Sequence, residues 1–180
     1  MSLFRSVVLA AVLAGSFLTV SQSHAANSSN QQVIMGWVEY VYIPNMEGRL
    51  KAKLDTGATT SSMRAEVVKV LDEDKPEKAS VLFQITDAEG KTNTLQRKLV
   101  RWVKIKTKDG KHQRRPVVEM DFCVAGHAIT SEVNLAPRAT FIYPILVGRN
   151  MMKTAKIIVD PERTFTSKIR CPMLDSDDKE

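Results

Sequence analysis

The sequence predicts an all-β fold, a closed barrel of short strands with one short helix near its C-terminal end. Short runs alternate apolar and polar residues, as half-buried strands do. Clusters of Gly, Pro, Asn and Asp separate these runs at frequent intervals. No segment carries apolar residues at helical spacing over the length of a long amphipathic helix, which leaves an all-β architecture.

The first half of the chain divides into strands at its turn residues. Aromatic and β-branched residues predict a strand over 37–43, and Pro and Gly in 44–48 mark a turn. The next strand, 50–54, alternates Leu and Ala with two lysines. Strands over 63–71 and 80–86 follow, joined by a charged connection.

The second half has the clearer hairpins. A tight turn at Asp87–Gly90 leads into a strand over 93–106, and Asp109-Gly110 is the best two-residue hairpin signal in the chain. Further strands are predicted at the following places: residues 116–124, residues 128–135, and the apolar run 145–147 that precedes Gly148 and a short helix.

The N-terminal sequence predicts export. Residues 1–25 have one early positive charge, an apolar run and a small-residue cleavage site at Ser23-His24-Ala25, as a signal peptide does. Residues 26–32 are expected to be a disordered lead-in, residues 33–172 one domain, and residues 173–180 an acidic tail. We therefore expect a periplasmic protein without stable membrane insertion after signal cleavage; the alternative is an uncleaved signal that serves as a tether.

Two cysteines, Cys123 and Cys171, would then lie in an oxidising compartment. A disulfide between them would close a loop of about 48 residues and contribute about 4 kcal/mol in the chain-entropy model. The alternative is that Cys123, between Phe122 and Val124, is a buried apolar thiol. Neither cysteine has a neighbouring histidine, which argues against a cysteine peptidase.

The net charge is +6, and many of the cations lie between residues 97 and 115. Several alternate with apolar residues, as on the solvated face of a strand; the alternative is a basic surface that attracts acidic peptides, anionic lipid or an anionic cell-wall polymer. The export signal and the few aromatic residues argue against nucleic acid as a partner.

The stretch Leu54-Asp55-Thr56-Gly57-Ala58 carries the most functional information. An apolar strand delivers Asp55 at its end, and Gly57 allows a turn that a side chain would obstruct. This arrangement resembles the catalytic turn of aspartic peptidases. Residues 145–152, two apolar residues with a glycine and a short helix, resemble the element that packs beside that turn in retropepsin-like peptidases.

A narrower resemblance covers nearly the whole domain. Its motifs are Gly36-Trp37, residues 51–58, Thr60-Ser61, residues 115–118, residues 146–149, and residues 158–161 with Arg163. In this order they resemble the bacterial retropepsin-like family historically labelled an ATP-dependent zinc protease, which implies an acid-protease-like barrel. The sequence has no His-Glu-x-x-His and no complete P-loop, so we expect neither zinc nor ATP, and no other cofactor.

The resemblance implies roles for the site residues. Asp55 would be catalytic, Thr56 would brace two turns through its hydroxyl, and Gly57 would present its carbonyl to substrate. Because the sequence has a single Asp-Thr-Gly, two copies of Asp55 would have to meet in a homodimer. Ala58 stands where pepsin-like enzymes often carry serine, so we expect a working pH of about 5–6.

The element at residues 147–149 is expected to bind substrate or support the turn. Val147 and Gly148 belong to the resemblance, but Arg149 lacks the acidic partner of viral retropepsins because Thr59 stands in that place. Arg149 could bind a substrate carboxylate or Glu66, or be a surface arginine at a helix start. The turns at 87–90 and 109–110 are both candidates for a substrate-covering flap, and Trp102 and Phe83 are better explained as core residues than as subsites.

These observations favour a periplasmic aspartic endopeptidase that hydrolyses peptides or proteins with a water activated by two Asp55 carboxylates. The alternative keeps the fold and drops the catalysis: a binding or regulatory module for a cell-envelope partner. Retention of Asp55, Thr56, Gly57 and Gly148 favours the enzyme, because loss of catalysis should relax at least one of them.

Overall fold

The computed structural model describes residues 32–44, 46, 48–107, 110–124, 126–137, 142–167 and 171. Within these residues the chain forms ten strands and one short helix, α1 (Arg149–Thr154), which confirms an all-β fold with a helix after Gly148. The predicted signal peptide (1–25), nearly all of the lead-in (26–32) and the acidic tail (173–180) lie outside the described residues. In the described part of the chain no helix has the length and apolar character needed to cross a membrane.

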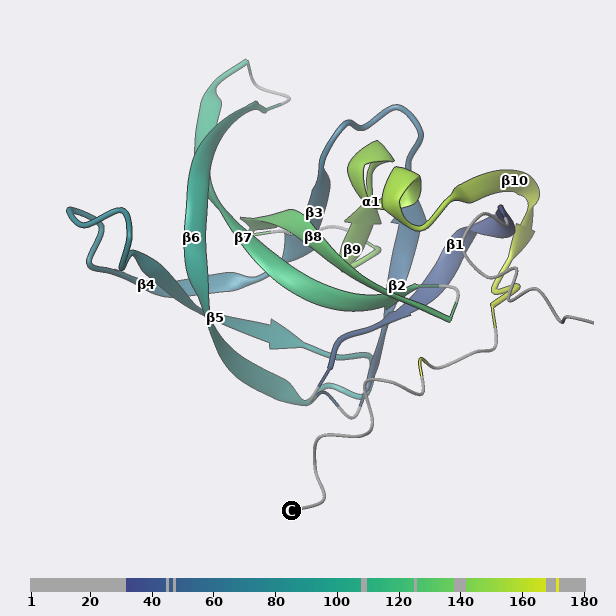
Figure 1. Cartoon of the computed structure of the whole chain (residues 1–180), viewed down its shortest axis with the longest axis horizontal. Coiled ribbons are helices and arrows are strands. Elements are labelled where there is room, and N and C mark those ends of the chain that lie inside the picture. Colours follow the sequence, from purple (N-terminus) through teal and green to yellow (C-terminus); the bar gives the residue numbers. More distant parts are fainter. Residues whose placement is uncertain are drawn as a thin grey trace, which may run out of the picture.

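The strands are β1 (Val33–Tyr42), β2 (Arg49–Leu54), β3 (Ser61–Arg64), β4 (Glu66–Leu71), β5 (Ser80–Thr86), β6 (Thr92–Lys106), β7 (His112–Val124), β8 (His127–Ala136), β9 (Ile145–Val147) and β10 (Ile157–Thr164). All ten belong to one sheet in the order β10-β1-β2-β9-β3-β8-β7-β6-β5-β4. Figure 1 shows the sheet curving around on itself.

The sheet closes into a ring because β1 also pairs with β7, at Val41↔Val124 and Tyr42↔Cys123. Strand β10 at one end of this order, and β6, β5 and β4 at the other, lie outside this ring. The long strand β6 links the two regions, since residues 92–98 pair with β5 and residues 99–106 pair with β7.

One continuous apolar core holds these strands together. Phe83 and Phe122 are fully buried in it, and Met63 and Ile145 bring β3 and β9 into the same cluster. Phe83 is therefore a core residue, as expected, while Trp102 packs against the core and carries the guanidinium of Arg114 over its ring at 3.8 Å.

Several details differ from the sequence-based prediction, among them the start of β1, which is Val33 rather than residue 37. The segment 63–71 is two strands, because the chain changes partners at Ala65: β3 pairs with β8 and β9, and β4 pairs with β5. β7 begins at His112 rather than at residue 116, which lengthens its hairpin with β6. β10 was not predicted; it is mostly exposed and contains Pro161, so it lacks the apolar alternation of a half-buried strand.

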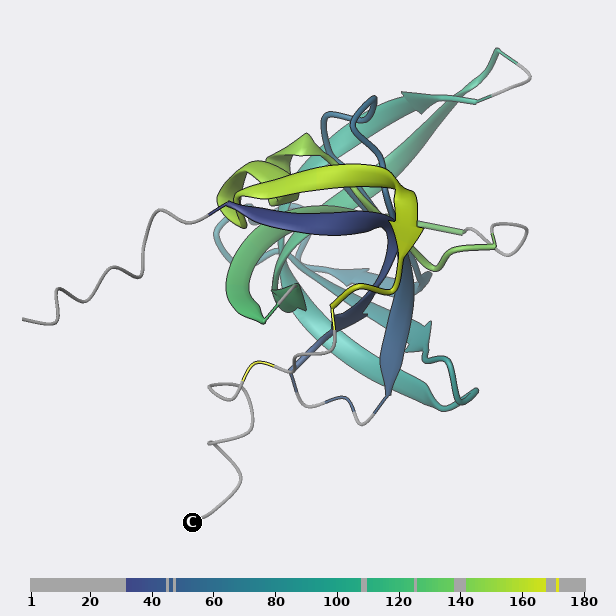
Figure 2. The ribbon, with the colours of Figure 1, turned by 90° about the vertical axis from the view of Figure 1, so that its right-hand side faces the viewer.

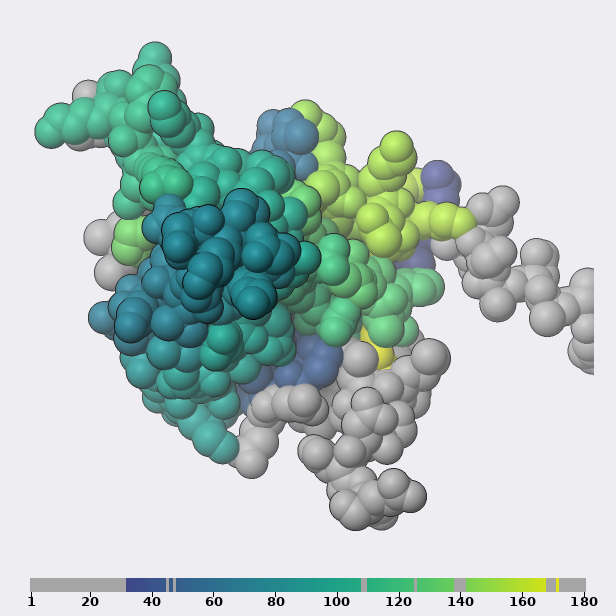
Figure 3. Space-filling model, turned by 60° about the vertical axis from the view of Figure 1, so that its left-hand side comes forward, coloured from purple at the N-terminus to yellow at the C-terminus, as the bar shows by residue number. Residues whose placement is uncertain are grey.

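The β6–β7 hairpin and the connection from β2 to β3 project from the same end of the molecule. Both lie at the top of Figures 1 and 2, whereas the β5–β6 turn lies at the bottom. Figure 3 shows the hairpin standing clear of the body of the protein. The hairpin is thus the extended element that shares an end with the Asp55 turn.

Candidate active site

Asp55 comes directly after β2, at the point where β2 runs parallel to β9. Its backbone N–H donates to the carbonyl of Val147 at 2.9 Å, so the ladder between the two strands continues one residue past β2. The side chain is partly exposed, while Leu54 and Val147 beside it are buried. Two paired strands with buried apolar side chains therefore present one carboxylate at the surface.

The residues after Asp55 form a tight turn around its carboxylate. The N–H of Gly57 donates to Asp55 Oδ1 at 3.0 Å, and the N–H of Ala58 donates to the Asp55 carbonyl at 3.1 Å. A Cβ at Gly57 would lie 3.2 Å from Oδ1, tighter than nine in ten real Cβ contacts. Glycine here lets the backbone approach the carboxylate closely. Thr56 is exposed and Ala58 is half-buried.

Gly148 packs directly against the other end of this turn. A Cβ on Gly148 would come within 2.6 Å of the Thr60 carbonyl carbon, so only glycine fits without moving backbone. Its N–H donates to the hydroxyl of Ser61 at 3.0 Å, and that hydroxyl donates to Asn150 Oδ1 at 2.8 Å. The backbone N–H of Ser61 donates to the same oxygen at 2.9 Å.

Ser61 and Asn150 thus join the turn to α1, and sequence reasoning assigned no role to either. The amide of Asn150 also donates to the carbonyl of Glu132, at 3.0 Å, which ties β8 into the network. Asn134, another residue without a predicted role, donates from Nδ2 to the Ser61 carbonyl at 2.7 Å. The adjacency of Asn150 to Gly148 and Arg149 in the sequence was the available signal.

Arg149 lies across the Asp-Thr-Gly turn. Its Nη1 donates to the carbonyls of Thr56 at 2.7 Å and Gly57 at 3.0 Å, and its Nη2 donates to the Thr59 hydroxyl at 2.8 Å. Its backbone N–H donates to the Ala58 carbonyl at 2.9 Å. The hydroxyl that replaces the expected acidic residue is therefore a partner of this arginine. Among the described residues its guanidinium bonds to the turn and not to Glu66.

The two cysteines form a disulfide. Cys123, on β7, and Cys171 are joined with their Cα atoms 5.7 Å apart, and both are buried. Tyr42 pairs with Cys123 at the closure of the ring. The bridge therefore fastens the C-terminal segment to the place where the sheet closes.

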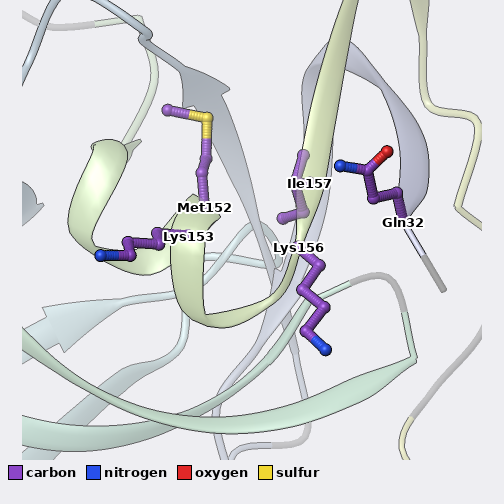
Figure 4. Close-up of a pocket in the computed structure, with 5 residues that line it drawn as sticks. All are labelled: Gln32, Met152, Lys153, Lys156 and Ile157. Atoms are coloured by element: carbon purple, nitrogen blue, oxygen red, sulfur yellow. The ribbon is translucent and has the colours of Figure 1, made fainter. Parts of the chain in front are cut away.

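A hollow of about 570 Å³ lies at the C-terminal end of α1, at the opposite end of the helix from Arg149. Gln32, Met152, Lys153, Lys156 and Ile157 line it. Figure 4 shows the two lysine side chains extending in different directions rather than converging on one point. Among the described residues no group of three or more His, Cys, Asp or Glu is placed to hold a metal ion.

Three comparisons place this geometry among known proteins. A family model, RimB-like, described as retropepsin-like aspartic endopeptidase RimB, matches residues 34–170. A crystal structure of a Legionella pneumophila protein of unknown function is similar with a TM-score of 0.65 and 32% identity, over 77% of this chain and 100% of that one.

Two curated relatives carry a different name. Proteins called "Probable alpha-L-glutamate ligase" from Shewanella halifaxensis and Shewanella pealeana are each 29% identical over 139 residues. The match covers 76% of this chain but 30% of each relative, so the chain spans less than a third of their length.

Proposed function

The chain belongs to the RimB-like family of retropepsin-like aspartic endopeptidases, and we propose that it is itself an aspartic endopeptidase that works as a homodimer. The observation that carries this proposal is the Asp55 turn. A partly exposed carboxylate is held by Gly57, while Arg149 and the Ser61–Asn150 network fix the turn from behind. Such rigid support is what a catalytic group requires.

The homodimer follows from the chemistry. Peptide hydrolysis of this type needs two carboxylates on either side of one water, and the sequence supplies a single Asp-Thr-Gly. A two-fold axis beside the turn would bring Asp55 of each subunit together. Thr56, which is exposed in the single chain, would then be free to brace the partner turn through its hydroxyl.

In the proposed reaction the two carboxylates share one proton, because two like charges so close do not both ionise. The ionised carboxylate takes a proton from the water as the water oxygen attacks the peptide carbonyl carbon. The protonated carboxylic acid gives its proton to the carbonyl oxygen, which yields a tetrahedral diol. The C–N bond then breaks as the nitrogen receives the proton that the first carboxylate took from the water. One diol hydroxyl gives its proton to the other carboxylate, and the new carboxyl group and amine are released.

The β6–β7 hairpin is the better candidate for the flap. It projects at the end of the molecule that carries the Asp55 turn (Figures 1 and 2). The other candidate turn, at 87–90, is fixed at the opposite end: the Ala88 N–H donates to the Arg49 carbonyl at 3.3 Å, and a Cβ on Gly48 would clash with Asp87. In this proposal the ring of strands is the acid-protease barrel of one half-site.

The place of action is proposed to be the periplasm. The N-terminal sequence has the pattern of an export signal, and the Cys123–Cys171 disulfide suits an oxidising compartment. A peptide or protein there would be the substrate.

The second candidate is a non-catalytic binding or regulatory module for a cell-envelope partner. One observation favours it: in the relatives named as probable glutamate ligases, the matching region is a minor part of a longer chain. A domain of this type therefore occurs within proteins that are named for a different activity.

A cleavage assay with the Asp55→Asn variant separates the two candidates. The chain from residue 26 onward, as wild type and as D55N, is tested on a peptide library with and without pepstatin and a chelator. We expect the wild type to cleave, with pepstatin inhibiting and the chelator having no effect, and D55N to be inactive. Because Ala58 offers no hydroxyl to the dyad, activity is expected to peak at about pH 5–6.

The same assay shows which part of the proposal is wrong if the expected result is not obtained. Cleavage retained by D55N removes Asp55 from the mechanism, and loss with chelator alone indicates a metal. An activity peak below about pH 3.5 contradicts only the role assigned to Ala58 and not the role of Asp55. Specific binding of an envelope protein without cleavage supports the module.

A further inference from the structure

The outward face of β2 carries a row of three cations. Every second residue of β2 from Leu50 to Leu54 is buried in the core, so strand alternation turns Arg49, Lys51 and Lys53 to the opposite face. Arg49 and Lys51 are exposed and Lys53 is half-buried. Among the residues that the structure describes, no carboxylate forms an ion pair with any member of this cation row.

Aromatic rings lie beside two of these cations. The guanidinium of Arg49 lies over the ring of Tyr40, 3.8 Å from its centroid, and Lys51 Nζ lies 6.0 Å from the ring centroid of Phe165. The two rings stack on one another with their centroids 4.6 Å apart. Stacking on a ring keeps Arg49 on this face, and its exposed guanidinium can still donate hydrogen bonds from its edge to an anionic partner.

The chain that follows β10 crosses this same face. Phe165 packs there, and Figure 2 shows the yellow segment after β10 descending beside β2. Further along, Cys171 is bonded to Cys123, which stands directly opposite Tyr42 on β1. Tyr42 in turn stands opposite Arg49. Because paired residues point to one side of a sheet, the disulfide lies on the face of the cation row, two strand spacings or about 10 Å from its first member.

The residues after Cys171 carry the opposite charge. Residues 175–180 read Asp-Ser-Asp-Asp-Lys-Glu, with four acids and one lysine. Four residues of extended chain, about 13 Å, separate Asp175 from the disulfide, which is enough to reach the cation row. In an extended segment Asp175 and Asp177 lie on one side, about 6.7 Å apart, and successive cations of β2 have the same spacing.

We propose that residues 172–180 bind as an extended acidic segment to the cation row of β2 in the same chain. Single exposed ion pairs are weak, but a short tether gives the segment an effective concentration of the order of millimolar, so weak pairs are sufficient. Glu89, whose carboxylate lies against Gly48, sets a limit, since its charge opposes the segment at the Arg49 end of the row. The bound segment neutralises a face that would otherwise attract an anionic polymer, a role that does not depend on peptide hydrolysis.

Carbodiimide cross-linking of the chain from residue 26 onward tests this contact, because it joins lysine amines to neighbouring carboxylates. In the wild type at low salt, peptide mapping should find Lys51 or Lys53 joined to an acidic residue of 175–180. Arg49→Gln should lower this yield by about threefold or more, although arginine itself does not react, and about 0.5 M salt should lower it as well. The matched control is R97Q, which removes an arginine on β6 and should leave the yield unchanged.

Amine acetylation gives a second measurement on the same chain. Lys51 should react about threefold more slowly in the wild type than in the D175N/D177N/D178N variant, because the acidic segment covers it. Lys69, on β4, should react equally in both. Thermal unfolding checks that each variant is folded.

A mixture of ¹⁵N-labelled and unlabelled protein shows whether the segment and the row belong to one chain. Cross-links of Lys51 or Lys53 within a single chain that weaken in folded R49Q support the proposal. Three outcomes overturn it: cross-links spread evenly over distant lysines such as Lys69, a yield that neither R49Q nor salt changes, or cross-links that join labelled to unlabelled chains.

Discussion

At the residue scale, one arginine holds the Asp55 turn. It does so through hydrogen bonds to backbone oxygens and not through an ion pair with an acidic side chain. Arg149 donates to two carbonyls of the turn and to the Thr59 hydroxyl. A guanidinium can reach several acceptors at once because its donors form a planar fork. This explains how the site tolerates Thr59, where the sequence comparison with viral retropepsins indicated a lost ion pair.

Arg149→Lys tests this role. A lysine ammonium is a single point donor on a flexible stem and does not span three acceptors, so the turn should lose its fixed geometry. We expect kcat/KM to fall by about 100-fold, because small displacements of a reacting group are costly, with little change in Tm since the side chain is exposed.

The control for this variant is Arg97→Lys, whose arginine donates to the adjacent Gln96 carbonyl away from the turn. R97K should keep full activity. An R149K protein with wild-type kinetics would show that the guanidinium contacts do not support catalysis.

At the element scale, the sequence predicted best where one face of a strand is buried. Leu50, Ala52 and Leu54 alternate with lysines, and β2 lies where expected. Two failures have physical causes. The change of pairing partner at Ala65 is set by the tertiary structure, and a largely apolar sequence does not show where it occurs. β10 is held by its pairing with β1 and not by a buried face.

The candidate site was only partly predictable for the same reason. Asp55 and Gly148 could be chosen because their neighbours in the sequence form motifs. The bonds from Ser61 to Asn150 and from Asn134 to Ser61 join residues on different elements. The packing of α1 against β3 and the register of β3 against β8 bring these polar groups together, and no local pattern encodes either.

Glu39, on β1, holds the segment that follows β10. Its side chain is 0% exposed, yet its carboxylate accepts hydrogen bonds from the N–H groups of Gly36 at 2.8 Å, Thr166 at 2.9 Å and Ser167 at 3.1 Å. The Thr166 hydroxyl donates to it as well. A buried carboxylate that accepts several hydrogen bonds is a strong anchor, since hydrogen bonds to a charged acceptor are stronger than those between neutral groups.

Glu39→Gln should therefore destabilise the fold by about 2–3 kcal/mol, because an amide brings an N–H towards donors and loses the charge-assisted bonds. Urea unfolding followed by tryptophan fluorescence measures this change. The control is Glu119→Gln, at an exposed position on β7, which should change stability little. Equal stability of E39Q and wild type would mean that the C-terminal segment is held by the disulfide and not by this carboxylate.

At the scale of the whole molecule, the proposed mechanism requires two copies of this fold, each supplying half of the catalytic site. The ring of strands, closed by β1 and β7 and fastened by Cys123–Cys171, supports one Asp55 turn at one end. The β6–β7 hairpin extends at that same end (Figure 3). Both features are explained if a second copy meets the first at the turn, because two carboxylates then share one water and two hairpins cover one substrate.

Subunit mixing tests this arrangement directly. If each active unit needs Asp55 from both chains, then a heterodimer of wild-type and D55N subunits is inactive. Co-expression of the two chains at equal levels should leave about one quarter of the dimers as wild-type pairs, so activity per total protein should be about one quarter of the wild-type value. Independent monomers would retain about half. A strictly linear fall of activity with the wild-type fraction would show that a single chain carries the whole site, and would require a second acid other than Asp55 within it.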